Sequence, residues 1–291
     1  MAFDFNFTKE TIKKADFFIW LVDKLTSHGW EYVNESRPQD YYVFSSKGES
    51  GEDNIMFQVK THYGSYTARA FHNSGYAYLA ARPIHSYKPA STATGVGGVL
   101  PNVDYTEFRL QGGNDVGIEE VFDIYYHVNK DRIIIVSNSP LHTLNIGSYL
   151  CILGKPYTLA KYNEYNTSAV ITLNPNTVGV CQSGVINRNP KERVELSTLH
   201  YLNPLAYQNS NNTFASEVAL HNAYDGLKYI IENVLVSNIR GKRGTDVFEV
   251  NMREDIYIDN EGNKYVMLPL QNTSNSADTN IRTMFLKVGN V

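Results

Sequence analysis

The chain has 291 residues and a hydrophobic fraction of 42%, enough for one large domain or two ordinary ones with real cores. A net charge of −4 without a polybasic block argues against sequence-specific or general binding to nucleic acid. The longest apolar helical run, residues 17–22, is far too short to cross a bilayer, and residues 1–10 lack the basic and apolar regions of a signal peptide, so we expect no membrane partner.

Aromatic residues make up 12% of the chain, chiefly 21 Tyr and 13 Phe, whereas charged residues make up 19%. Tyrosine offers a large contact area with a polar tip, which suits lasting contacts with other proteins. Tyr and Phe are also strand residues, so composition alone favours a β-rich protein. Cys151 and Cys181 have no CxxC spacing and are most simply reduced, partly buried thiols.

The first predicted element is an amphipathic helix over residues 8–28. Thr8 is its expected N-cap, and Glu10 lies in the first turn, where the helix dipole favours a carboxylate. Gly29 is expected to end the helix, and Trp30 to fold back onto that end. An apolar stripe with helical spacing is formed by Ile12, Ala15, Ile19, Val22 and Leu25 and widened by Phe18 and Leu21.

Short strands are predicted after the helix. Residues 41–45 and 55–61 form an expected hairpin around the glycine- and acid-rich turn at 48–53, and the alternation of Ile55, Phe57 and Val59 predicts a half-buried strand. Further strands are predicted at residues 30–33, 66–71 and 105–110, while residues 76–81 fit a helix or a strand.

Residues 86–104 read as a long loop with two prolines and three closely spaced glycines. A loop of this length within a compact domain is usually functional or ordered by a partner. We interpret it as an arm that contacts a neighbouring subunit; a mobile surface loop is the alternative.

The central feature is a hairpin over residues 121–137. Phe122, Ile124, Tyr126 and Val128 fall on alternate positions and therefore share one face of a strand. Residues 129–131 supply turn chemistry. The β-branched run at 133–136 is apolar on both faces, which predicts a strand in the middle of a sheet that is covered on both sides.

The rest of the chain is predicted to be mostly strands. They lie at residues 150–153, 169–173, 247–250 and 283–288, and a hairpin joins 255–258 to 264–268 through an acidic, glycine-containing turn. A helix is predicted within 216–234, since Leu227, Ile230, Ile231 and Val234 fit helical spacing.

Together these elements predict an α+β fold in which an N-terminal helix packs on a mixed, mostly antiparallel sheet and a β-rich second lobe follows. The expected divisions are an assembly domain at 1–173, an inserted or extended lobe at 174–245, where Asn, Ser and Pro become frequent, and a β-rich closing segment at 246–291.

The sequence contains none of the common catalytic motifs. The glycines at 94–99 lack the Lys-Ser/Thr of a phosphate loop, the eight histidines have no ligand spacing, and the turn at 259–262 is too short for a calcium loop. A pair of catalytic carboxylates on separate strands, as in glycosidases, stays open as an alternative. We therefore expect no catalytic residue, metal or cofactor, and a protein that is not an enzyme.

The order of these segments resembles virion structural proteins of tailed bacteriophages, those of the neck or tail end, including tail-terminator-like proteins. The resemblance is carried by the helix ending in His28-Gly29-Trp30, by YYVFSSKGESGEDNIMFQVKT, and by VFDIYYHVNKDRIIIVSN followed by SYLCILGKPY. The closing RGKRGTDVFEVNMREDIYIDNEGNKYVMLPL is similar to the ends of larger neck and tail proteins. Residues 174–245 depart from a simple one-domain terminator.

This resemblance implies a non-enzymatic virion component, made in the host bacterial cytoplasm, whose copies form a ring, often six-fold, beside neck, tail-tube or sheath proteins. A Tyr-rich chain of low charge suits the lasting protein–protein contacts that such a ring needs. Head-to-tail contacts between identical copies form a closed ring when the rotation from one copy to the next divides a full turn evenly. We expect inter-subunit contacts in residues 86–104 and 155–168, and an acidic neighbour for the basic 240–243 turn, for which a solvated turn is the alternative. The candidate contact residues are Tyr87, Val96, Leu100, Tyr157, Tyr162, Tyr165, Arg240, Lys242 and Arg243.

Two other functions remain as alternatives. A receptor- or carbohydrate-binding tail or baseplate module would use aromatic faces beside carboxylates, but both tryptophans, Trp20 and Trp30, are expected in the core. A hydrolase on a β scaffold would act on cell-wall or capsule polysaccharide.

Overall fold

The protein's structure, a computed structural model, describes residues 6–13, 16–33, 41–60, 78–84, 86–88, 98–100, 106–109, 121–138, 149–155, 157–158, 168–173, 181–186, 193–194, 198–201, 215–221, 228–237, 256–258, 261–269 and 283–291. Within these ranges there are one helix and 21 strands, and every strand pairing is antiparallel. The predicted α+β, β-rich fold class is confirmed.

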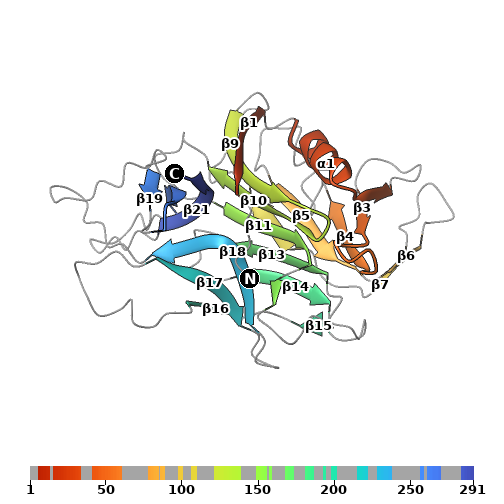
Figure 1. Cartoon of the computed structure of the whole chain (residues 1–291). Helices are drawn as coiled ribbons and strands as arrows, with labels where there is room; N and C mark the ends of the chain where they lie inside the picture. Colours follow the sequence, from red (N-terminus) through yellow and green to blue (C-terminus); the bar gives the residue numbers. More distant parts are fainter. Residues whose placement is uncertain are drawn as a thin grey trace, which may run out of the picture.

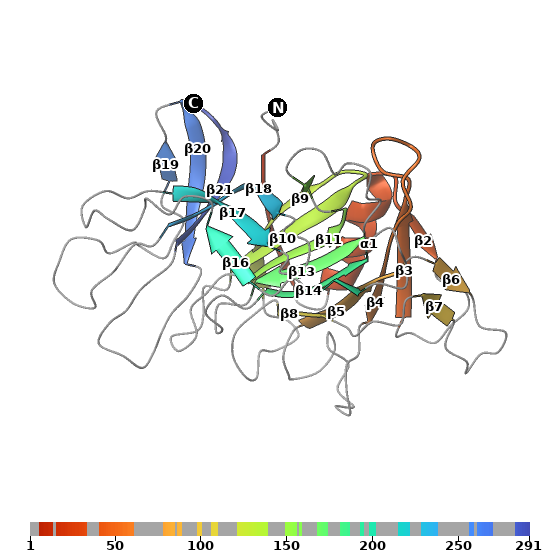
Figure 2. The ribbon, with the colours of Figure 1, turned by 90° about the horizontal axis from the view of Figure 1, so that it is seen from below.

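A seven-stranded central sheet has the order β1-β9-β10-β11-β13-β14-β15. On one side of it lie the helix α1 and a five-stranded N-terminal sheet, β2-β3-β4-β5-β8; the C-terminal sheet, β16-β17-β18-β21-β20-β19 with β12 paired to β18, lies on the other side (Figures 1 and 2). The central strands are Thr8–Lys13, Val121–Val128, Arg132–Asn138, Tyr149–Gly154, Ala169–Leu173, Cys181–Ile186 and Arg193–Val194.

The remaining strands complete the other sheets. The N-terminal sheet consists, in the order given, of Glu31–Val33, Tyr41–Ser46, Ile55–Lys60, Tyr78–Pro83 and Thr106–Arg109, and β6 (Ser86–Lys88) pairs with β7 (Gly98–Leu100) as a separate ribbon. The C-terminal sheet consists of Thr198–Tyr201, Ala215–His221, Lys228–Ser237, Thr283–Asn290, Asn263–Pro269 and Ile256–Ile258, with Tyr157–Thr158 as β12.

The predicted helix is wrong in its first part, where the chain forms strand β1 instead. Thr8 is therefore no N-cap: α1 runs only from Phe17 to Ser27, and β1 pairs with β9. The physical reason is the period of residues 8–13, in which the half-buried Glu10 and Ile12 alternate with exposed neighbours. The predicted stripe is also displaced, because Ile19 is 63% exposed while the buried face of α1 consists of Phe17, Trp20, Leu21 and Leu25.

The end of α1 is confirmed at Gly29, which has a φ of +84°. The Trp30 N–H donates to the carbonyl of Leu25 and the Gly29 N–H to that of Thr26, each at 3.1 Å. These two bonds form a Schellman motif, in which a left-handed residue lets the chain turn back over the last helical turn. Trp30 is thereby folded into the core, as its place after the helix predicted.

The central hairpin is confirmed, and its burial follows the predicted pattern. Its strands β9 and β10 pair so that Ile135 lies opposite Tyr126. Ile133 and Ile135 pack in the core beneath α1 and the N-terminal sheet, while Ile134 and Val136 point to the opposite face and are 1% and 0% exposed. Strand β10 is thus covered on both sides, as its two-sided apolar sequence predicted.

Other strand predictions are confirmed at the 41–46/55–60 hairpin, at residues 149–154 and 169–173, and at the C-terminal hairpin and closing strand. The helix predicted within 216–234 is wrong: β17 and β18 occupy this region, since its β-branched residues suit a strand and outweigh the helical spacing. Of the ambiguous stretch 76–81, residues 78–81 lie in β5 and the first two lie outside the described residues. The predicted 86–104 loop contains β6 and β7. The predicted strands at 66–71 and 247–250 lie outside the described residues.

Pairing crosses the expected division at residue 173. Strand β14 pairs with β13 along five residue positions and so continues the central sheet, and β12 pairs with β18 of the C-terminal sheet. The division of the chain at 173 and 245 stays a prediction.

Candidate functional site

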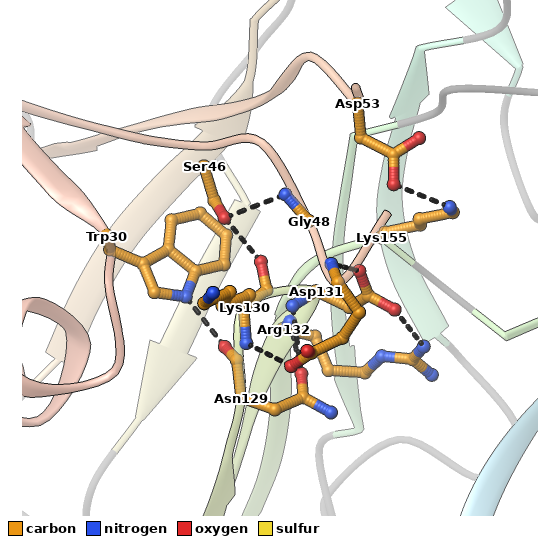
Figure 3. A network of polar contacts seen from close by, with 10 residues as sticks. Trp30, Ser46, Gly48, Asp53, Asn129, Lys130, Asp131, Arg132 and Lys155 are labelled. Carbon is orange, nitrogen blue, oxygen red and sulfur yellow. Dashed lines mark hydrogen bonds and ion pairs between the residues drawn. The ribbon is translucent and has the colours of Figure 1, made fainter. Parts of the chain in front are cut away.

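A polar cluster joins the loop between β3 and β4, the turn between β9 and β10, and the end of β11 (Figure 3). We call it the loop–turn junction. It consists of Trp30, Ser46, Gly48, Glu49, Asp53, Asn129, Lys130, Asp131, Arg132 and Lys155.

The β9–β10 turn is built by its first residue. The side-chain oxygen of Asn129 accepts hydrogen bonds from the backbone N–H groups of Asp131 at 2.9 Å and Arg132 at 3.0 Å. An asparagine that bonds its own backbone in this way closes a tight turn without help from the rest of the protein. The Asn129 carbonyl in turn accepts the indole N–H of Trp30 at 2.7 Å, which ties the end of α1 to the turn.

The β3–β4 loop docks onto this turn through reciprocal bonds. The hydroxyl of Ser46 donates to the carbonyl of Lys130 at 2.5 Å and accepts the Gly48 N–H at 3.0 Å. The Glu49 N–H donates to a carboxylate oxygen of Asp131 at 2.9 Å, while the Lys130 N–H donates to the Glu49 carboxylate at 3.1 Å. Bonds in both directions fix the position of the loop along the turn as well as its distance from it.

The charges of the junction are balanced within it. Asp53 is 4% exposed, and its carboxylate accepts a bond from the Lys155 ammonium at 2.8 Å. The backbone N–H of Lys155 also donates to the carbonyl of Asp131 at 2.8 Å, and Arg132 lies 3.6 Å from the Asp131 carboxylate. A buried carboxylate needs such a partner, because an isolated charge in the interior is costly.

The junction can therefore hold elements together, since its carboxylates already accept hydrogen bonds or ion pairs from neighbouring groups. Across the parts of the chain that the structure describes, no group of three or more His, Cys, Asp or Glu side chains is placed to hold a metal ion. No helix in those same parts is long and apolar enough to cross a membrane.

A second polar cluster, the Glu10 clasp, connects β1 to α1 and β9. One carboxylate oxygen of Glu10 accepts bonds from the Lys24 ammonium and the Tyr126 hydroxyl, both at 2.6 Å, and the other accepts the Trp20 indole N–H at 2.7 Å. The Lys24 nitrogen also lies 5.0 Å from the centre of the Tyr126 ring. The clasp thus gathers a carboxylate, an ammonium and two aromatic donors at the edge of the central sheet.

Protonation at the clasp follows from this geometry. Burial alone would raise the pKa of Glu10, but the hydrogen bonds from Lys24, Tyr126 and Trp20 outweigh it and hold the pKa below its usual 4.5. Burial would lower the pKa of Lys24, and the bond to Glu10 reverses the effect, so that this pKa is raised. Burial and the neighbouring Glu10 carboxylate both raise the pKa of Tyr126.

His127 lies on β9 next to the junction and faces away from the core beneath α1. Burial, with smaller contributions from the positive charges of Arg132 and His28, lowers the pKa of His127 to about 4. The imidazole is therefore neutral across the physiological range.

The candidate contact residues from the sequence fall in different places. Tyr87 lies in β6 and packs, half-buried, against Val43 and Ile84, and Leu100 ends β7. Tyr157 lies in β12, opposite Ile230 of β18. The others lie outside the described residues: Val96, Tyr162, Tyr165, Arg240, Lys242 and Arg243. Tyr87 takes part in neither the junction nor the clasp.

Sequence reasoning missed both polar clusters. The turn residues 129–131 and the acidic 48–53 turn were each recognisable, but their docking joins positions more than 80 residues apart. The clasp was hidden because Glu10 was assigned to the first turn of a helix. A carboxylate on the half-buried face of an alternating segment was the signal that pointed to it.

Comparison with known proteins gives no identification. No family model matches the chain, and no curated protein matches it.

Proposed function

We propose that this chain is a non-enzymatic structural component of a phage virion that forms a homo-oligomeric ring at the head–tail junction or tail end, as a tail terminator, neck or tail completion protein. The observation that carries the proposal is the loop–turn junction, in which clustered charged groups bond to one another and to backbone groups of the scaffold. Polar groups used in this way make a scaffold rigid, and a rigid scaffold suits assembly into a ring.

Two further observations support this function over the alternatives. Trp20 and Trp30 are 7% and 3% exposed, so neither supplies the exposed aromatic face that a carbohydrate-binding module would use. The ribbon of β6 and β7 lies at the outer end of the N-terminal sheet, away from the C-terminal sheet (Figures 1 and 2). An arm in that position suits contact with a neighbouring copy of the chain.

The test is the mass of the full chain in solution, followed by electron microscopy of the purified protein and of particles from the phage that encodes it. We expect a single oligomer with a ring-shaped projection and the chain in intact particles. A monomer at all concentrations that is also absent from particles would refute the proposal. Activity on cell-wall or capsule polysaccharide would favour the hydrolase, and glycan binding by the monomer the receptor-binding module.

The proposed contacts can be tested separately. The double change Arg240→Ala and Arg243→Ala is expected to weaken assembly at low salt if these residues face an acidic neighbour, and to do so less at raised salt, because salt already screens such contacts in the wild type. Lys47→Ala, in the exposed part of the β3–β4 loop, is the matched control for lost positive charge. If the double variant and the control assemble to the same extent, the basic turn is not part of the proposed interface.

A further inference from the structure

Strand β1 is the first strand of the central sheet and bonds to β9 along one edge. Four of its six side chains are exposed and the other two, Glu10 and Ile12, are half-buried. Apolar burial, the largest favourable contribution for most elements, therefore holds this segment only at Ile12, which packs against the core beneath α1, and at Phe7 just before the strand, which is 3% exposed. The neighbouring β9 differs sharply, because five of its eight residues are buried.

Side-chain bonds replace the missing apolar contacts. The Glu10 clasp joins β1 to two other elements through three donors. On the opposite face of the strand, Asp123 of β9 accepts the Thr11 hydroxyl at 2.5 Å and pairs with Lys9 at 3.0 Å. The Lys9–Asp123 pair is partly exposed, with side chains 39% and 22% accessible, and solvent screening limits what such pairs contribute.

We propose that β1 is a releasable strand, clamped on the central sheet by the Glu10 carboxylate, and that protonation of this carboxylate frees β1 and uncovers the edge of β9. Taking up a proton from solvent removes the negative charge that faces Lys24 and turns one acceptor oxygen into a donor. The Lys24 ammonium and the Tyr126 hydroxyl then lose a charged acceptor, and a bond to a neutral acceptor is weaker.

The sign of the pH dependence follows from the clasp. The pKa of Glu10 is lowered in the folded protein, so the clasp is intact above the usual value of 4.5 and is lost as pH falls through the lower, folded value. Lys24 and Tyr126, the titratable groups that face Glu10 from α1 and β9, both have raised pKa values and keep their protons through this range. This inference does not rest on the proposed function.

The first test is the pH titration of the two indole N–H signals in a nitrogen-labelled sample of the full chain. The Trp20 indole bonds to Glu10 and should shift with a midpoint below 4.5, whereas the Trp30 indole bonds to a backbone carbonyl and is the internal control. Amide hydrogen exchange at residues 8–13, corrected for intrinsic rates, should rise through the same midpoint while residues 132–138 stay protected. A Trp20 signal that does not titrate, or unchanged exchange in β1, would overturn the proposal.

The second test isolates the clasp at pH 7. Glu10→Gln keeps the shape of the side chain and removes its charge, and trypsin cleavage after Lys9 should become about tenfold faster than in the wild type, in line with the loss of charge-assisted bonds. Glu52→Gln, at an exposed loop position, is the matched control and should cleave at the wild-type rate. Lys24→Met removes the cation that pairs with Glu10 and should also accelerate trypsin cleavage after Lys9.

Faster cleavage with protected residues 132–138 supports the clamp. Unchanged cleavage in both Glu10→Gln and Lys24→Met, or a loss of protection in β10 as large as in β1, would show that Glu10 does not clamp β1 in particular.

Discussion

Gly48 lies at the narrowest point of the loop–turn junction. Its φ is +67°, and a Cβ atom there would lie 2.3 Å from a carboxylate oxygen of Asp53 and 2.8 Å from one of Asp131. The Asp53 oxygen already accepts a bond from the Lys155 ammonium and the Asp131 oxygen one from the Glu49 N–H, so neither can move without cost. We expect Gly48→Ala to lower the free energy of unfolding by about 3 kcal/mol in urea denaturation.

Gly51 in the same loop is the matched control. Its φ of +77° carries the same backbone preference, but a Cβ atom there would meet nothing within 4 Å. Gly51→Ala should therefore cost only the left-handed conformation, about 1 kcal/mol. Equal costs for the two substitutions would show that the close approach of the Asp53 and Asp131 carboxylates contributes nothing.

His127 makes the protein sensitive to mild acid. Its pKa is about 4 in the folded protein and near 6.5 in the unfolded chain, so between these values the unfolded state binds more protons and stability falls as pH drops. His127→Gln, which cannot titrate, should flatten the dependence of the urea midpoint between pH 6.5 and 4.5, above the range where Glu10 acts. The same slope in wild type and variant would contradict this assignment.

At the scale of elements, α1 is held at its C-terminal end by Trp30. The indole donates to the Asn129 carbonyl at 2.7 Å, and its ring lies 5.2 Å from that of Phe57. Trp30→Phe keeps an aromatic ring but leaves a part-buried carbonyl without this donor, so we expect a cost of about 1–3 kcal/mol in thermal unfolding. A cost near zero would show that water replaces the indole.

The elements also show what the sequence could predict. Alternation identified β4 and β9, whose apolar faces repeat every second residue against one core. The helix predictions for residues 8–13 and 216–234 were wrong for a shared reason. Apolar residues three and four positions apart fit a helix, yet alternation in the first segment and β-branching in the second favour a strand. The junction and the clasp were beyond reach, because local turn chemistry does not reveal which distant segment will dock on it.

At the scale of the whole molecule, the central sheet is an inner layer. The core beneath α1 contains the side chains on one face of β9 and β10, and the other face buries Tyr125, Ile134 and Val136. Direct bonds also cross between layers: the Phe7 N–H donates to the Lys287 carbonyl at 2.7 Å, and the Met56 N–H donates to the Ser168 hydroxyl at 2.8 Å. The N-terminal and central sheets therefore share one core, and direct bonds join the central sheet to both of its neighbours.

The Phe7–Lys287 bond predicts that the central and C-terminal sheets unfold together. Trp20 and Trp30 both lie in the core beneath α1, so tryptophan fluorescence reports on that core, whereas far-ultraviolet circular dichroism reports on strands throughout the chain. We expect the two signals to give one coincident transition in urea, because the two sheets are bonded directly at Phe7 and Lys287. Ile134→Ala and Ile135→Ala, on opposite faces of β10, should each cost about 2–5 kcal/mol and shift both signals equally. If Ile134→Ala instead shifts the dichroism transition and leaves the fluorescence transition in place, the two sheets unfold independently. The C-terminal sheet then does not stabilise the central sheet.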